Sequence, residues 1–161
     1  MSVFHVFYLA SDSKSSFEQI KRSVIDNIPI VPQDVAKSRP QVSENTDNSL
    51  SVWCEYFSLL VKNGGQPVIF RSEDYGMSFQ YQFWFDAYTV TPGWFEGMLF
   101  FVGKIMNLYD GDCVLESNGD TPIVLRKNKN ITVDGRGLKK EQMCLFDELQ
   151  LVYQTGELKQ V

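Results

Sequence analysis

The most constraining feature of the sequence is a strict alternation of residue types between positions 77 and 86. Met77, Phe79, Tyr81, Phe83 and Phe85 alternate with Ser78, Gln80, Gln82, Trp84 and Asp86. A repeat of two is typical of a β-strand, because successive side chains of a strand point to opposite faces. The pattern therefore predicts a half-buried strand of an antiparallel sheet, with the first set of residues facing the core.

Elsewhere in the N-terminal two-thirds, the spacing of apolar residues and the positions of glycine and proline predict the helices and strands. Residues 3–10 are β-branched and aromatic and predict a first strand. Residues 15–28 carry apolar positions at spacings of three and four, which predicts an amphipathic helix, and residues 92–109 predict a helix that lies on the sheet. Residues 50–62 fit either a strand or a helix, and we favour the helix. Residues 68–70 predict the start of another strand.

The C-terminal third predicts a meander followed by a helix. The strands are expected at residues 113–116, 121–126 and 131–133, with Asn118-Gly119 as the first hairpin turn, because Asn-Gly tolerates positive φ. Residues 139–153 predict a final helix. Residues 29–49 are polar and contain three prolines, which indicates a long loop, with a short edge strand as the alternative within it. We expect one α+β domain over residues 1–161: a largely antiparallel β-sheet with two to four helices packed mainly on one face.

Charge and cysteine content narrow the class of partner and the compartment. The 161 residues carry a net charge of −5, which disfavours nucleic acid and anionic membrane and favours a basic protein partner. The three cysteines form no CxxC pair, so we expect reduced thiols in a cytoplasmic protein. The longest apolar run outside the first strand, residues 98–102, is far shorter than the roughly 20 residues of a membrane-spanning helix.

No group of residues predicts a catalytic site, and we expect no enzyme, no cofactor and no metal. The single histidine, His5, lies inside an apolar strand, and Cys113 follows an acidic residue, which disfavours a thiolate. The glycines form no phosphate-binding motif, and Asp110 and Asp112 are interpreted as loop-capping residues. The basic cluster is interpreted as a solvated turn. Its members are Lys127, Lys129, Arg136, Lys139 and Lys140.

The second face of the alternating strand is the best candidate for binding. It would present Trp84, Asp86 and Tyr88, and exposed aromatic residues are frequent anchors of protein interfaces. Either this face contacts a partner, or a loop or the C-terminal helix covers it. The predicted partner-binding residues are Glu73, Asp74, Tyr75, Trp84, Asp86 and Tyr88.

Between residues 77 and 134 the chain resembles a known family. The matching features are Phe83 and Phe85 in the strand, Gly111-Asp112 before an apolar strand, the Asn118-Gly119-Asp120 hairpin and Leu125-Arg126. In these it resembles the SitI-type bacterial immunity proteins, which protect a cell against a toxin delivered by its kin. The resemblance implies stoichiometric binding and neutralisation of a cognate toxin. Two alternatives remain: a small hydrolase using Cys113 or Cys54 with His5, and an adaptor subunit of a larger assembly.

Overall fold

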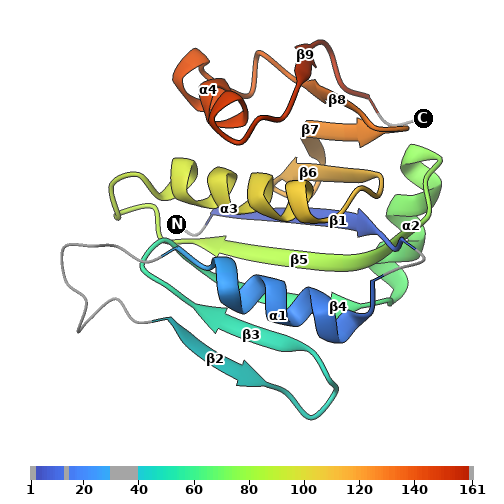
Figure 1. Ribbon diagram of the computed structural model, residues 1–161, viewed down its shortest axis with the longest axis vertical. Helices are drawn as coiled ribbons and strands as arrows, with labels where there is room; N and C mark the ends of the chain where they lie inside the picture. Colours follow the sequence, from blue (N-terminus) through green and yellow to red (C-terminus); the bar gives the residue numbers. More distant parts are fainter. Residues whose placement is uncertain (1–2, 13–14, 30–39, 160–161) are drawn as a thin grey trace.

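The fold is built on one large sheet. The computed structural model describes residues 3–12, 15–29 and 40–159, and within them nine strands pair in the order β2-β3-β4-β5-β1-β6-β7-β8-β9. The strands are β1 (Val3–Ala10), β2 (Gln41–Glu44), β3 (Leu50–Trp53), β4 (Phe57–Asn63), β5 (Phe79–Ala87), β6 (Cys113–Ser117), β7 (Thr121–Lys127), β8 (Asn130–Val133) and β9 (Tyr153–Thr155). The helices are α1 (Phe17–Asn27), α2 (Gln66–Tyr75), α3 (Trp94–Leu108) and α4 (Lys140–Glu148). All pairings are antiparallel except β8 with β9, which confirms the predicted α+β class (Figure 1).

Three helices cover one face of the sheet. Figure 1 shows α1 and α3 lying across the strands on the same side, with α4 beyond α3. Under them, Phe7 of β1 packs edge-to-face on Phe83 of β5, with ring centroids 5.4 Å apart, and both side chains are fully buried. Phe101 of α3 packs on Phe85 of the same strand. We call this side of the sheet the helical face; it carries the main apolar core.

The alternating strand is confirmed as β5, but its apolar residues do not all share one face. Tyr81, Phe83 and Phe85 belong to the main core, whereas Met77 and Phe79 belong to a second cluster on the opposite side. The change of side coincides with a register shift in the pairing of β1 with β5 between Leu9 and Ala10. An irregularity of this kind re-aims the following side chains, and a strict count of two along the sequence does not reveal it.

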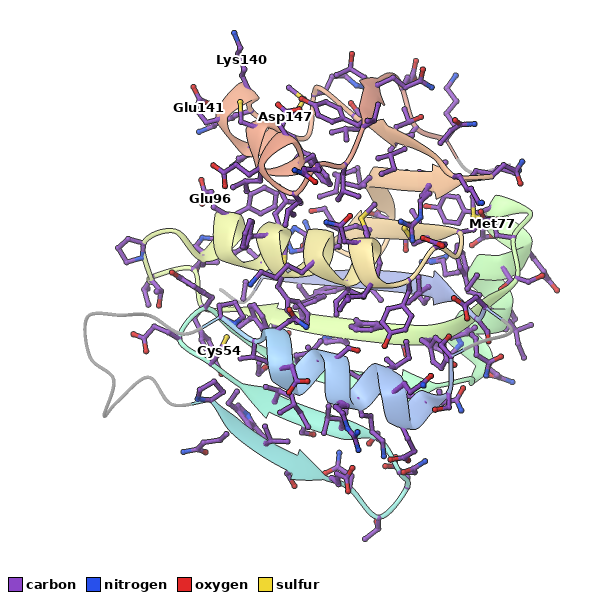
Figure 2. All side chains as sticks on the ribbon, viewed as in Figure 1. Cys54, Met77, Glu96, Lys140, Glu141 and Asp147 are labelled. Atoms are coloured by element: carbon purple, nitrogen blue, oxygen red, sulfur yellow. The ribbon has the colours of Figure 1, made fainter. Side chains whose placement is uncertain are left out.

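Two predicted elements were wrong. Residues 50–62 form the hairpin β3–β4 and not a helix, since Leu50 and Val52 pair with Val61 and Leu59, and all four side chains are buried. Residues 68–70 lie in α2 and not in a strand, because Gly65 and Pro67 begin a helix there and Gly76 ends it in the left-handed region. α2 packs on the second face of the sheet, at one end of the molecule near Met77 (Figure 2).

The C-terminal meander is confirmed, and its turn and helix are set by backbone chemistry. Asn118 and Gly119 have φ of 54° and 79°, as the tight turn requires. The final helix is shorter than predicted: α4 ends at Glu148, and the chain then adds β9 beside β8. α4 packs on α3 at Gly103, where an added Cβ would lie 2.4 Å from Leu149 Cδ1.

The C-terminal end of α3 is held by a buried arginine of β7. Arg126 is 5% exposed and donates to the carbonyl oxygens of Met106 at 2.7 Å and Gly111 at 2.9 Å, and to that of Tyr109. A guanidinium at this position satisfies carbonyl groups that have no partner within the helix and lies at the negative end of its dipole. This contact fixes α3 against the sheet, and so positions the opposite end of the helix.

Candidate functional site

A large cavity lies at the N-terminal end of α3. Its volume is about 1020 Å³, and it opens between the start of β1, the end of β6, the start of α3 and the segment that leads into α4. It is lined by Val3, His5, Thr89 to Glu96, Ser117, Gly135 to Lys140, Gln142 and Met143. Figure 2 shows Glu96 at the start of α3 and Lys140 at the start of α4 on the same side of the view, with the Lys140 side chain pointing away from α3. We call this space the His5 cavity.

His5 lies on the inner wall of this cavity. Its side chain is 3% exposed and packs near the rings of Trp94 and Phe95, with centroid distances of 5.9 and 5.7 Å. Its Nδ1 is the buried side-chain nitrogen or oxygen that lacks a hydrogen-bond partner among the described residues. Burial lowers the pKa of His5 from 6.5 to about 4, so the imidazole is neutral at pH 7.

The predicted basic cluster is divided between two places. Arg136, Lys139 and Lys140 line the His5 cavity, whereas Lys127 and Lys129 belong to the turn between β7 and β8. The interpretation as one solvated turn therefore holds only for the second group. The sequence alone does not predict that the segment carrying Arg136, Lys139 and Lys140 packs beside the start of α3.

The second face of the sheet carries a groove over β3, β4 and the end of β5 that bears Trp84 and Asp86. Asp86 of β5 pairs with Ser58 of β4 and Trp84 with Leu60, and Trp53 of β3 pairs with the same Ser58. We call this region the aromatic face: a shallow groove of about 280 Å³ lined by Ser51, Trp53, Ser58, Leu59, Leu60, Trp84 and Asp86. Trp84 stacks on Phe4 of β1 at 4.7 Å with nearly parallel rings.

The six predicted partner-binding residues do not form one surface. Trp84 and Asp86 lie on the aromatic face, and Tyr88, 38% exposed, follows the end of β5. Glu73 is exposed on the last turn of α2. The other two, Asp74 and Tyr75, are engaged within the fold and are described next.

A buried polar network fastens α2 to the sheet. Glu116 of β6 is fully buried and accepts from Tyr75 Oη at 2.6 Å and from Arg71 Nε at 2.9 Å. Arg71 also donates to Asp74 at 2.7 Å and to the carbonyl oxygen of Gly119. Tyr75 is 1% exposed, so it is not accessible to a partner in this fold. The sequence signal for this network is a carboxylate, Glu116, at a buried position of a short strand.

The cysteines are separated from the histidine. His5 pairs with Ser117 and Leu9 with Cys113, so Cys113 lies four residues along β6, about 13 Å at the usual rise of a strand. Burial raises the pKa of Cys113 to about 11 and also raises the pKa of Cys54. These thiols carry little thiolate at pH 7, and the Cys113–His5 pair, one of the two pairs of the hydrolase alternative, is not in contact.

Three further observations on the described residues concern metal binding, a loop carboxylate and membrane spans. No group of three or more His, Cys, Asp or Glu side chains is arranged to hold a metal ion in that part of the chain. Asp112 accepts from the backbone N–H of Asn128 at 2.9 Å, in agreement with the loop-capping interpretation. None of the four helices in the described residues has the length and apolar character needed to cross a membrane.

Comparison of the chain with protein-family models, with curated proteins and with solved structures found no match.

Proposed function

We propose that this chain binds another protein through its aromatic face, and that the partner is a cognate bacterial toxin which it neutralises. The observation that carries the proposal is the exposure of Trp53, which is 42% exposed beside the half-buried Trp84 on an open part of the sheet. Large aromatic side chains at such a position are the usual anchors of protein interfaces.

The geometry of these side chains favours tight contact. Trp84 is held in one orientation by its stack on Phe4, so little side-chain entropy remains to be lost on binding. Leu60 pairs with it on β4, Trp53 lies one strand further on β3, and Ser51 and Ser58 supply hydroxyl groups in the same groove. An apolar centre with a polar surround is typical of stable interfaces.

Charge favours a basic partner. Asp86 lies on the aromatic face, Glu55 is exposed in the β3–β4 turn next to it, and the whole chain has a net charge of −5. Complementary charge speeds association and selects against acidic competitors. The resemblance to SitI-type immunity proteins supports a toxin as the class of partner.

The test co-expresses the chain with the toxin encoded by the adjacent gene. We expect the chain to rescue growth and to co-purify with the toxin at a fixed ratio. The double variant Trp53→Ala/Trp84→Ala should weaken binding by at least about a hundredfold, since two anchors at about 2 kcal/mol each are removed.

The matched control is Leu108→Ala/Val152→Ala, which truncates two exposed apolar side chains outside the aromatic face. This control should rescue as well as the wild type. Equal loss in both variants, or rescue that survives the tryptophan changes, would remove the aromatic face from the proposal. A stable homo-oligomer with no toxin binding would favour the adaptor alternative.

A further inference from the structure

We propose that the His5 cavity is a binding site for a small organic anion. Its carboxylate or phosphate group would bind at the first turn of α3, and its apolar part would pack on Trp94 and Phe95. This site lies on the helical face and is separate from the aromatic face, so the proposal does not depend on the proposed function.

The N-terminal end of α3 supplies free hydrogen-bond donors. The helix is 15 residues long and begins after Gly93, which gives it no side-chain cap. The N–H of Trp94 donates to Thr91, but within the described residues the N–H groups of Phe95 and Glu96 have no acceptor. The first amides of a helix, aligned with its dipole, form a natural anion site.

His5 provides an independent indication of a ligand. Buried polar atoms are almost always paired, and among the described residues the Nδ1 of His5 is the side-chain exception. His5 is held on the central strand β1 beside the first two residues of α3, and it lines the same cavity. Because His5 lines the same cavity, a rotation of its ring would bring Nδ1 to a bound anion, a partner that the protein itself does not supply.

The charged groups around the cavity favour an anion on balance. Arg136, Lys139 and Lys140 line it from the segment before α4 and from the first turn of that helix. The opposing charge on the lining is Glu96, whose carboxylate is 3.5 Å from Gln142 Nε2. Arg136 pairs with Asp134 at 2.9 Å and with Glu157 at 3.9 Å, so its positive charge is offset, but the two lysines have no ion pair among the described residues.

The volume and walls indicate more than an inorganic ion. A cavity of about 1020 Å³ is at the upper end of the size of small-molecule sites. Trp94, Phe95, Leu138 and Met143 give it apolar surface next to the donors. This combination fits a molecule with one anionic group and an aromatic or aliphatic body.

The test uses the fact that the chain has one histidine. The protein, made without a histidine tag and with labelled histidine, is titrated with phenyl phosphate while the imidazole NMR signals are followed. We expect a saturable shift of the His5 signals and a rise of its pKa, because a nearby negative charge stabilises the imidazolium.

Two matched double variants locate the effect. Lys139→Gln/Lys140→Gln should weaken phenyl phosphate binding by about tenfold or more, whereas Lys127→Gln/Lys129→Gln, in the β7–β8 turn, should leave it unchanged. No saturable shift up to about 10 mM, or an equal loss in both variants, would overturn the proposal. Binding of inorganic phosphate as tight as that of phenyl phosphate would overturn the role given to Trp94 and Phe95. Toxin rescue by the lysine variants tests the proposed function separately.

Discussion

The two faces of the sheet use neighbouring residues of the same strands but are stabilised in different ways. On the helical face, Phe7 and Phe83 are fully buried under three helices. On the second face, α2 is held by hydrogen bonds to Glu116, and beyond α2 the strand residue Trp84 is only half-buried. The difference indicates a division of roles: the helical face supplies most of the stability, and the second face keeps aromatic side chains available for binding.

The largest effect should come from truncating a ring on the helical face. Phe83→Ala removes a side chain that is fully buried in the main core and leaves a cavity between β5 and the helices. We expect the free energy of unfolding to fall by about 3–5 kcal/mol. Urea unfolding followed by circular dichroism measures the change. A loss below about 1 kcal/mol would mean that the helical face is not the main source of stability.

The next largest effect is a dependence of the free energy of unfolding on pH, caused by His5. Its folded pKa of about 4 lies below the ordinary 6.5, so the unfolded chain binds the proton more readily. Stability from this group is full above pH 6.5 and is lost as the pH falls toward 4, by about 3 kcal/mol in all. The slope of unfolding free energy against pH, measured without phosphate, should be smaller in His5→Gln than in the wild type between these limits. Equal slopes would contradict the burial of a neutral imidazole.

A smaller loss of stability is expected on the second face, from removal of the hydrogen bond between Tyr75 and Glu116. Tyr75→Phe removes a hydroxyl that donates to a buried carboxylate at 2.6 Å and keeps the ring. We expect a loss of about 1.5–3 kcal/mol, as for other hydrogen bonds to charged groups. In a double-mutant cycle with Glu116→Gln the two losses should not add, because both changes remove the same interaction. Additive losses would show that the network does not hold α2.

The sequence predicted best where local chemistry decides the outcome. The β6–β7 turn follows from Asn118-Gly119 alone, and the amphipathic pattern of residues 15–28 predicts α1 because one helix face must be buried. The hairpin β3–β4 was missed because a helical spacing fits Val52, Trp53, Tyr56, Phe57, Leu60 and Val61, and only the pairing with β5 decides between the two.

Of the two candidate sites, one follows from local sequence and the other does not. Trp84 and Asp86 could be predicted on one face, because the repeat of two is local to β5. The His5 cavity could not be predicted, since it forms where β1 meets the start of α3 and the segment that contains Arg136. Long-range packing brings these three segments together, and no local pattern in any of them indicates the other two.

The smallest effect on stability should come from the aromatic face, and it separates stability from binding most clearly. Trp53 is 42% exposed on β3, so Trp53→Ala removes less buried surface than Phe83→Ala does. We expect the free energy of unfolding to change by about 1 kcal/mol or less, while affinity for the toxin falls about thirtyfold, as for loss of an interface anchor worth about 2 kcal/mol. Phe83→Ala should show the opposite pattern, with stability lost and affinity of the folded fraction retained. If both variants lost stability and affinity in the same proportion, the two faces would not have separate roles, because binding would then depend only on how much of the chain is folded.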